Sequence, residues 1–205
     1  MTVTDVNVVK SAIFERPDDA NKGTLGSLLC VCGSYGMAGA AVMSAKGALR
    51  TGIGLAKCAL PRSIYPIVAQ TILESVYYPL SENADGRISK VNVPFLVSES
   101  CKSSATLVGC GLGVCDDTLK IVFSLIENST TPLVLDADAL NCVAKQPEIL
   151  LRKKAPIIIT PHPGEMSRLT GLATPLVNAE RERVALDFAQ KYGVVTVRKG
   201  AGTVI

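Results

Sequence analysis

The sequence has 205 residues, of which 48% are apolar and 19% charged, so it can build one packed domain, and a mainly disordered chain is excluded. Its uninterrupted apolar runs are about one strand long, far below the roughly 20 residues that cross a bilayer, so we expect a soluble protein with no membrane partner. The net charge of +3 is spread along the chain and aromatic residues make up 4%, which gives no support to a nucleic-acid-binding face.

Short β-branched runs alternate with longer helical stretches along the chain. Several runs are apolar throughout, as expected for strands that are covered on both faces. The expected strands lie at residues 27–32, 54–60, 74–78, 105–108, 133–136, 157–160 and 194–197. The expected helices lie at residues 38–51, 89–101, 118–128, 147–152 and 175–192. This alternation predicts an α/β fold, a three-layer α/β/α sandwich with a mostly parallel central sheet.

In a parallel sheet the ligand lies at the carboxyl ends of the strands, so the residues that follow each strand are the candidates for chemistry. After the first strand, the small residues at 33–41 open a helix, permit close backbone approach and leave amides free for an anion. After the fourth strand, residues 109–113 (G-C-G-L-G) again put glycine where a Cβ would obstruct a ligand. The alternatives are a tight strand-to-helix turn for the first segment and a plain flexible turn for the second.

Charged side chains follow the next two strands. Asp136 ends one strand and Asp138 lies in the turn after it, where a carboxylate could hold a metal-bound phosphate or a hydroxyl. Asp138 is equally well interpreted as a helix N-cap. Two prolines fix the backbone on both sides of His162, and the rigid presentation of His162 and Glu165 indicates a site. The alternative is a proline-stiffened loop that starts a helix with Glu165 in its first turn.

Residues 197–205 are expected to form a strand, a glycine turn and a second strand, with Lys199 at the turn. The segment is not a Walker P-loop, which requires G-x-x-x-x-G-K-[ST] and a following helix. An ordinary hairpin with a solvated lysine is the alternative. Residues 22–26 (K-G-T-L-G) introduce the first strand, and we assign them no independent function.

Seven cysteines and a single histidine limit the chemistry. An odd cysteine number, without a charged and hydrophobic leader at residues 1–10, favours a reduced cytosolic protein. Cys30 and Cys32 lie in an apolar run, and their spacing fits neither a redox nor a zinc motif, so we expect buried structural thiols. Because His162 is the only imidazole, a histidine-rich metal site or a serine triad would have to be built around it.

Seven short segments carry a resemblance when they are taken together and in order. They are K-G-T-L-G at Lys22, G-S-Y-G-M-A-G-A-A at Gly33, A-L-R-T-G-I-G-L at Ala48, G-C-G-L-G at Gly109, L-D-A-D-A-L-N at Leu135, I-T-P-H-P-G-E at Ile159 and K-G-A-G-T-V-I at Lys199. In this register the sequence resembles the NAD(P)H-hydrate dehydratase family, within the ribokinase-like superfamily. The resemblance covers about residues 22–205 and predicts one ribokinase-like domain over residues 1–205.

The resemblance implies repair of NADH or NADPH whose reduced ring has taken up water, with ADP or ATP driving removal of that water. Similar enzymes phosphorylate the ring hydroxyl and then lose phosphate, so two nucleotides would lie head to head, with Mg²⁺ at the transferring phosphoryl group. Carried over by motif, the residues at the hydrated cofactor are Gly39, Ala40, Ala41, Gly113 and His162. Those of the ADP or ATP site are Lys199, Gly200, Ala201, Gly202 and Thr203. Those that would orient Mg²⁺ or its water shell are Glu165, Asp136 and Asn141.

One departure from the family concerns catalysis. Members continue after K-G-A-G-T-V-I into a G-x-G-D segment, whose amides form an anion hole and whose aspartate is the general base. The 205 residues contain no such segment, so we expect a domain that lacks its carboxyl-terminal portion, and the catalytic residue is unknown. Losing the base would cost a factor of roughly 10²–10⁴ in rate and losing the anion hole ~10²–10³. We therefore expect binding of the hydrated cofactor, weak binding of ADP and ATP, and slow turnover.

Two other function classes stay open at this point. A ribokinase-like small-molecule kinase would share the scaffold, because a fold alone does not fix the substrate. It would release a stable phosphorylated alcohol, whereas the dehydratase regenerates reduced cofactor. A catalytically impaired nucleotide-binding or interaction module would instead pair an uncovered sheet edge with another chain, and we expect a homo-oligomer.

Overall fold

The computed structural model describes residue 10, residues 17–21 and residues 23–205. Lys22, which opens the K-G-T-L-G motif, lies outside the described residues. Residues 1–9, which belong to the stretch where no leader is expected, also lie outside them. All other motif residues lie within them.

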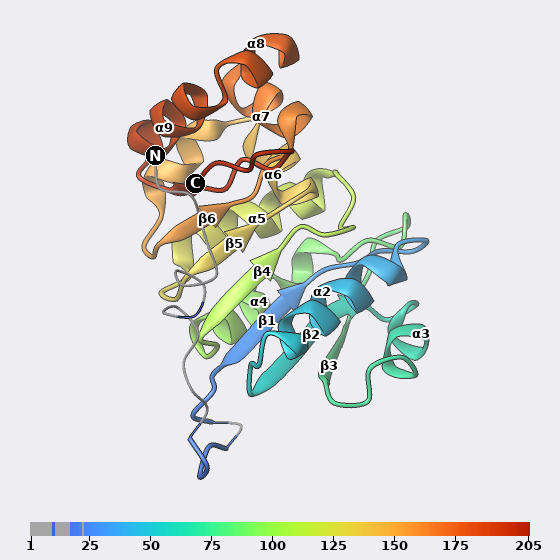
Figure 1. Cartoon of the computed structure of the whole chain (residues 1–205). Helices are drawn as coiled ribbons and strands as arrows, with labels where there is room; N and C mark the ends of the chain where they lie inside the picture. Colours follow the sequence, from blue (N-terminus) through green and yellow to red (C-terminus); the bar gives the residue numbers. More distant parts are fainter. Residues whose placement is uncertain (1–9, 11–16, 22) are drawn as a thin grey trace.

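Seven strands form one sheet in which every neighbouring pair is parallel (Figure 1). The strands are β1 (Ser27–Val31), β2 (Leu55–Pro61), β3 (Val76–Leu80), β4 (Ala105–Val108), β5 (Leu133–Leu135), β6 (Ile157–Ile159) and β7 (Val195–Thr196). Each of the seven expected strands is present. A strand covered on both faces has no solvent side, which is why β5 and β6 contain only aliphatic residues.

The order of the strands in the sheet is β3-β2-β1-β4-β5-β6-β7. The chain runs outward from β1 to β3, then returns to the other side of β1 and continues from β4 to β7. The direction of winding therefore reverses between β1 and β4, which pair in register from Leu28 opposite Ala105 to Val31 opposite Val108. In parallel α/β sheets, the crevice at such a reversal is where ligands bind.

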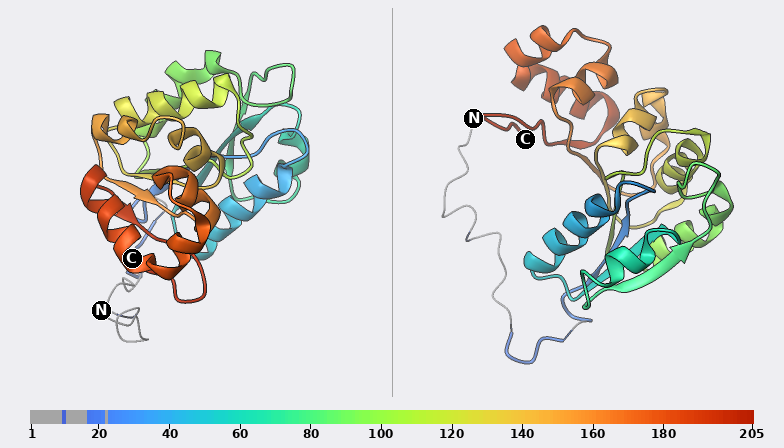
Figure 2. Two further views of the ribbon diagram at one scale, coloured as in Figure 1. Left: turned by 90° about the horizontal axis from the view of Figure 1, so that it is seen from above. Right: turned by 90° about the vertical axis from the view of Figure 1, so that its right-hand side faces the viewer.

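Alternate residues of β1 and β2 belong to two separate buried clusters, one on each face of the sheet. Leu29 and Val31 pack with Leu96 and Ile121, whereas Cys30 packs with small and aliphatic residues of the opposite layer. Figure 2 shows the consequence: α2 lies on one face of the sheet, and α4 and α5 lie on the other. The molecule is a three-layer α/β/α sandwich, as predicted.

The helices differ in length and kind along the chain. The α-helices are α2 (Ala38–Arg50), α3 (Tyr65–Ala69), α4 (Val93–Cys101), α5 (Asp116–Asn128), α6 (Asp138–Val143), α7 (Pro163–Thr170), α8 (Thr174–Ala179) and α9 (Arg181–Tyr192). The 3₁₀ helices are η1 (Lys90–Asn92) and η2 (Pro147–Arg152). Figure 1 shows α7, α8 and α9 gathered at one end of the sheet, beyond β6.

Three features of the helices were not predicted from the sequence. The expected helix at 175–192 is interrupted at Glu180, whose backbone (φ −112°, ψ 39°) is not helical, so it forms α8 and α9. The expected helix at 147–152 is the 3₁₀ helix η2. The short helix α3 was missed, whereas α6 and α7 were foreseen only as the alternatives for Asp138 and for the loop before Glu165. Both α3 and α7 carry proline in their first turn, where proline suits a helix although it is often taken as a loop signal.

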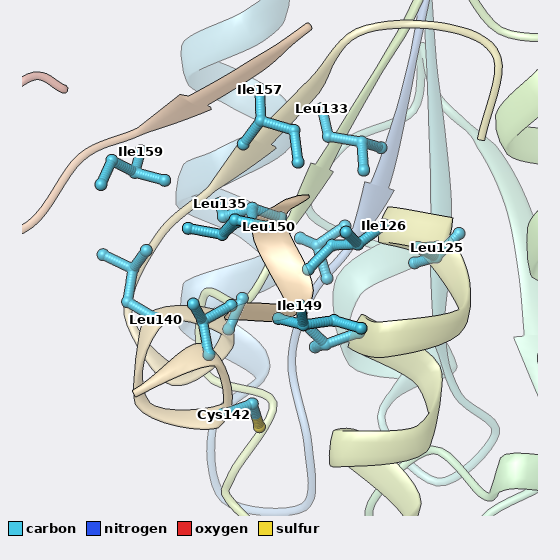
Figure 3. Close-up of a cluster of buried hydrophobic side chains, with 14 of the residues drawn as sticks. Leu125, Ile126, Leu133, Leu135, Leu140, Cys142, Ile149, Leu150, Ile157 and Ile159 are labelled. Carbon is cyan, nitrogen blue, oxygen red and sulfur yellow. The ribbon is translucent and has the colours of Figure 1, made fainter. Parts of the chain in front are cut away.

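A large part of the core lies where α5, α6 and η2 cover β5 and β6. Figure 3 shows Leu150 of η2 beside Leu135 of β5, and Leu125 and Ile126 of α5 and Ile149 of η2 belong to the same buried cluster. All five are at most 2% exposed. Each aliphatic side chain buried in this way contributes ~1.5–3 kcal/mol. This packing fixes the ends of β5 and β6, which carry candidate residues. Within the described residues, no helix is long and apolar enough to cross a membrane.

Candidate functional site

The loops that follow β1 and β4 meet at the reversal of the sheet. The Gly33 N–H donates to the carbonyl of Cys110 (2.8 Å), and the Ser34 hydroxyl donates to the carbonyl of Gly111 (2.8 Å). Gly33 and Gly111 both have positive φ, which favours glycine. The two glycine segments found in the sequence therefore form one surface, joined by hydrogen bonds through the backbone and Ser34.

The start of α2 lies against this surface. A Cβ on Gly111 would lie 2.7 Å from Cβ of Ala40 and 3.1 Å from Cβ of Met37, so only glycine lets the β4 loop pack on the helix. The N-cap residue Met37 gives no side-chain cap, and the first turn contains no acidic residue. The N-terminus of α2 thus carries positive partial charge that no side chain of its own neutralises.

The three predicted substrate residues of α2 differ in exposure. Gly39 is exposed, and a Cβ there would meet nothing within 4 Å, whereas Ala40 is half-buried against Gly111. Ala41 is 2% exposed, and its methyl group packs in the core toward Gly33. Gly39 therefore presents an open backbone, while Ala41 could reach a ligand only through its main chain.

Asp138 links the β4 loop to α6 and α7. Its Oδ2 accepts the N–H of Gly113 (2.8 Å), and its Oδ1 accepts from Nδ2 of Asn141 (3.3 Å). The amide oxygen of Asn141 accepts from Arg168 of α7 (2.8 Å). Asp138 is the first residue of α6 and the N-cap is Ala137, so the N-cap interpretation of Asp138 was wrong by one position.

Backbone strain lies between the two aspartates. Ala137 has φ 52° and ψ −117°, and it is the only residue other than glycine with positive φ in the described part of the chain. Such a conformation persists only where the surrounding contacts enforce it, and it often occurs at functional sites. Here the carbonyl of Asp136 packs so closely on Gly109 that no Cβ would fit. The strained residue thus lies in the turn that leads from Asp136 to α6, between the two candidate aspartates.

An ion pair joins the ends of β5 and β7. The ammonium of Lys199 lies 2.7 Å from Oδ1 of Asp136, with both side chains partly exposed. The other oxygen of Asp136, Oδ2, is 3.9 Å from the sulfur of Cys110. The N–H of Lys199 donates to the carbonyl of Pro161 (2.8 Å), which places the Lys199 turn beside the His162 segment. The fold therefore brings together candidates that are 63 residues apart in the sequence.

His162 and Glu165 form the N-terminal cap of α7. Nδ1 of His162 accepts from the N–H groups of Gly164 (3.0 Å) and Glu165 (3.4 Å), while Oε2 of Glu165 accepts the N–H of His162 (2.8 Å). Because Nδ1 accepts, the imidazole proton is on Nε2, which is 3.4 Å from Oε1 of Glu165. The helix-starting interpretation is thus realised. The His162 side chain is still 50% exposed, so the same residue can contact a ligand.

The Lys199 turn is a small hairpin held at its base. Arg198 and Val204 form an antiparallel bridge, and the Thr203 hydroxyl donates to the carbonyl of Gly200 (3.1 Å). Arg181 of α9 donates to the carbonyl of Gly202 (2.9 Å). The predicted turn is therefore present, but the strands predicted on its two sides reduce to this one bridge. Its lysine pairs with Asp136 while the side chain stays 41% exposed.

The three residues predicted to orient Mg²⁺ do not lie around one point. Both oxygens of Glu165 face His162, the amide oxygen of Asn141 faces Arg168, and Asp136 pairs through one oxygen with Lys199. Within the described residues, no group of three or more His, Cys, Asp or Glu side chains could hold a metal ion. Mg²⁺ is commonly bound by one or two carboxylates together with substrate phosphates. Asp136 fits such a partial site, because its Oδ2 is outside the lysine pair.

A turn that sequence reasoning did not single out also borders the site. Arg87 lies over Gly113: a Cβ on that glycine would be 2.5 Å from Nε of Arg87, and Nη1 of Arg87 donates to the carbonyl of Val114 (3.3 Å). The turn is fixed by Asn83, whose Oδ1 accepts the N–H of Arg87 (3.1 Å). The N-A-D-G-R sequence predicts a turn but not its partner loop. Arg87 is therefore a candidate that only the fold could show.

Cys30 and Cys32 are buried, at 2% and 1% exposure, as expected for structural thiols. Cys32 also hydrogen-bonds to Cys110, and this bond lowers the pKa of the Cys110 thiol to about 7 while it raises that of Cys32 well above its ordinary value. The seven cysteines, all within the described residues, are free thiols. The proximity of Cys32 and Cys110 could not be predicted from the sequence, because the two residues are on separate loops.

Comparison with known proteins places these features in a family. A family model described as NAD(P)H-hydrate dehydratase matches residues 28–205. The chain is 38% identical over 190 residues to the bifunctional NAD(P)H-hydrate repair enzyme Nnr of Thermofilum pendens, covering 93% of this chain and 36% of that protein. It is 31% identical over 193 residues to the ADP-dependent (S)-NAD(P)H-hydrate dehydratase of Neisseria meningitidis, covering 93% of this chain and 61% of that protein.

Among solved structures, the fold is similar to the ADP/ATP-dependent NAD(P)H-hydrate dehydratase of Bacillus subtilis co-crystallised with ATP and Mg²⁺. The TM-score is 0.78 at 28% identity, and the match covers 96% of this chain and 66% of that one. A ribokinase-like superfamily protein from Enterococcus faecalis matches with a TM-score of 0.74 at 20% identity, which supports the fold alone. The chain thus spans between about a third and two thirds of the length of these relatives.

Proposed function

The chain belongs to the NAD(P)H-hydrate dehydratase family, and on this premise we propose that it binds hydrated NADH or NADPH together with ADP or ATP, and that its reaction is the nucleotide-dependent removal of the added water. One observation carries the proposal. The loops after β1 and β4, the His162 cap and the Lys199 turn form a continuous network at the carboxyl edge of the sheet, where a parallel fold binds its ligands.

The substrate side is assigned to Gly39, Ala40, Ala41, Gly113 and His162, as the family motifs imply. The uncapped N-terminus of α2 supports an anionic ligand there, because its free N–H groups and dipole favour negative charge. Gly39 leaves this backbone open. With Nδ1 engaged by the helix amides, the Nε2–H of His162 is the group that can donate a hydrogen bond to the ligand. Arg87 extends this side with a positive charge next to Gly113.

The nucleotide side is assigned to Lys199, Gly200, Ala201, Gly202 and Thr203. Asp136 holds the Lys199 ammonium in place before a nucleotide arrives, and the ammonium can then donate to a phosphate oxygen. When bound, Mg²⁺ would neutralise charge on the transferring phosphoryl group, and Oδ2 of Asp136 is the oxygen that would hold it. Glu165 is assigned to orient His162, and Asn141 to orient Asp138, rather than to bind the metal.

Calorimetric titration of hydrated NADPH and of ADP into the wild type and into two single variants, His162→Ala and Lys199→Met, tests the two assignments. His162→Ala should weaken hydrated NADPH by about 2- to 12-fold, the value of one neutral hydrogen bond of roughly 0.5–1.5 kcal/mol, and leave ADP unchanged. Lys199→Met should weaken ADP by about 10-fold or more, as expected for a bond to a charged group, and leave hydrated NADPH unchanged. Equal loss of both ligands in either variant, or loss of neither, would contradict the division of the site. Self-association, expected from the sequence, remains a proposal that the same samples can test by sedimentation.

A further inference from the structure

Two thiols lie at the junction of the loops that follow β1 and β4. Cys32 comes directly after β1, and Cys110 lies between Gly109 and Gly111. Their backbones are neighbours, because the N–H of Gly109 donates to the carbonyl of Val31 (3.2 Å) and the N–H of Gly33 donates to the carbonyl of Cys110 (2.8 Å). Adjacent strands are ~4.7–4.9 Å apart, and a disulfide spans Cα atoms about 4.4–6.8 Å apart. The separation of the two chain segments therefore suits a disulfide.

The two side chains also lie on the same face of the sheet, and each thiol shifts the pKa of the other, as close neighbours do. The sulfur of Cys110 also donates a hydrogen bond to Oδ2 of Asp136 (3.9 Å). Cys110 packs against the same buried cluster that contains Cys32. Cys32 is 1% exposed, whereas Cys110 is partly exposed on the site side. A small reagent can thus reach Cys110, and the buried thiol that lies next to it is that of Cys32.

We propose that Cys32 and Cys110 form an oxidisable dithiol pair, in which the Cys110 sulfur attacks a hydroperoxide and Cys32 then closes a disulfide across the junction of the two loops. In the first step the Cys110 sulfur takes one oxygen from the hydroperoxide, which leaves as an alcohol, or as water if hydrogen peroxide is used, and a sulfenic acid forms. In the second step the Cys32 sulfur bonds to the Cys110 sulfur, and the sulfenic oxygen leaves as water. Two thiols lose two hydrogens and two electrons, and the hydroperoxide accepts them.

A competing pair lies next to this one. Cys30 and Cys58 are register partners in β1 and β2, so their backbones are also adjacent. Both are buried, at 2% and 1% exposure, and neither offers an exposed sulfur for the first step. The difference in access selects Cys32 and Cys110. Because the bond would form in the folded chain whether or not the site binds a dinucleotide, this inference is independent of the proposed function.

Peptide mapping of the folded wild-type protein decides the proposal. The protein is treated with hydrogen peroxide, remaining thiols are alkylated after denaturation, and the digest is analysed by mass spectrometry without reduction. We expect a peptide linked through Cys32 and Cys110, with five alkylated cysteines, that is the seven of the sequence less two. Dithiothreitol should restore all seven. The linked peptide should be absent from Cys32→Ser and Cys110→Ser and retained in the matched control Cys58→Ser.

Three results would overturn it. They are a link between any other pair, conversion of Cys110 alone to the sulfinic or sulfonic acid, or seven alkylated cysteines after a treatment that oxidises a reference dithiol. The wild-type map gives one of these answers by itself, so a serine variant that fails to fold does not affect the outcome. Circular dichroism of each variant before oxidation shows whether its map can be compared with that of the wild type.

Discussion

Replacing Glu165 separates a structural role from a metal-binding role. Glu165 is 4% exposed, and its two oxygens face the N–H and the Nε2 of His162 at 2.8 and 3.4 Å. Glu165→Ala removes half of the capping box and so leaves the part-buried His162 N–H without its acceptor, at ~1–3 kcal/mol. We therefore expect the free energy of unfolding to fall by about 1–3 kcal/mol.

Glu165→Gln is the matched control, because glutamine also serves at this position of a capping box. Its amide oxygen can still accept from His162 N–H, while its neutral NH₂ group replaces the charged oxygen that lies 3.4 Å from Nε2. We expect a loss of about 0.3–1 kcal/mol, the value of a charge near a helix N-terminus. For Glu165→Ala we expect a midpoint lowered by roughly 2–12 °C, taking ~2–4 °C per kcal/mol for a chain of this size. Urea unfolding followed by circular dichroism measures both. An alanine variant within about 0.5 kcal/mol of wild type, or equal losses in both variants, would refute the capping argument.

Two further predictions concern stability. Gly109→Ala should lower the free energy of unfolding by about 4 kcal/mol or more, because its φ of 126° is unfavourable for alanine and the Cβ would overlap the Asp136 carbonyl. Gly47→Ala is the control: Gly47 lies within α2 with open space around it, and the substitution should raise the free energy of unfolding by ~0.5–1 kcal/mol. Similar unfolding midpoints for the two variants would contradict this expectation. The hydrogen bond from Lys102 lowers the pKa of Glu99, so ionised Glu99 stabilises the fold above its unfolded pKa, and this contribution is lost as pH falls through its folded pKa. Glu99→Gln should therefore flatten the acid side of a stability profile measured from pH 7 downward, and an unchanged slope would count against the pairing.

The strands were predictable because burial on both faces leaves a signal in the chain itself. Ile157–Ile159 and Leu133–Leu135 contain no polar residue, which is typical of a parallel strand that is buried on both faces. The helix α7 was harder to predict, because Pro163 and Gly164 favour a loop and only the structure shows the capping box at His162. Proline at the first position and a capping partner at the third are local signals that a closer search for helix starts could have used.

The contacts of the site were predictable only in part. Parallel topology brings the ends of β5 and β7 to one edge, so the neighbourhood of Asp136 and Lys199 followed from the strand pattern. Their ion pair depends on side-chain directions that a strand pattern does not specify. The approach of Arg87 to Gly113 is a contact between separate loops, and it depends on the reversal of strand order. Local patterns do not encode contacts of this kind.

Hydrogen exchange of the backbone amides, measured with saturating hydrated NADPH and separately with ADP, shows where each ligand binds. We expect hydrated NADPH to protect residues 33–41, 109–113 and 161–165, and ADP to protect residues 198–204. A shallow groove of about 210 Å³ between α7 and α9, lined in part by Leu169, Phe188 and Tyr192, offers the alternative location. Protection confined to that groove, or none in the four segments at saturation, would contradict a ligand site at the carboxyl edge of the sheet.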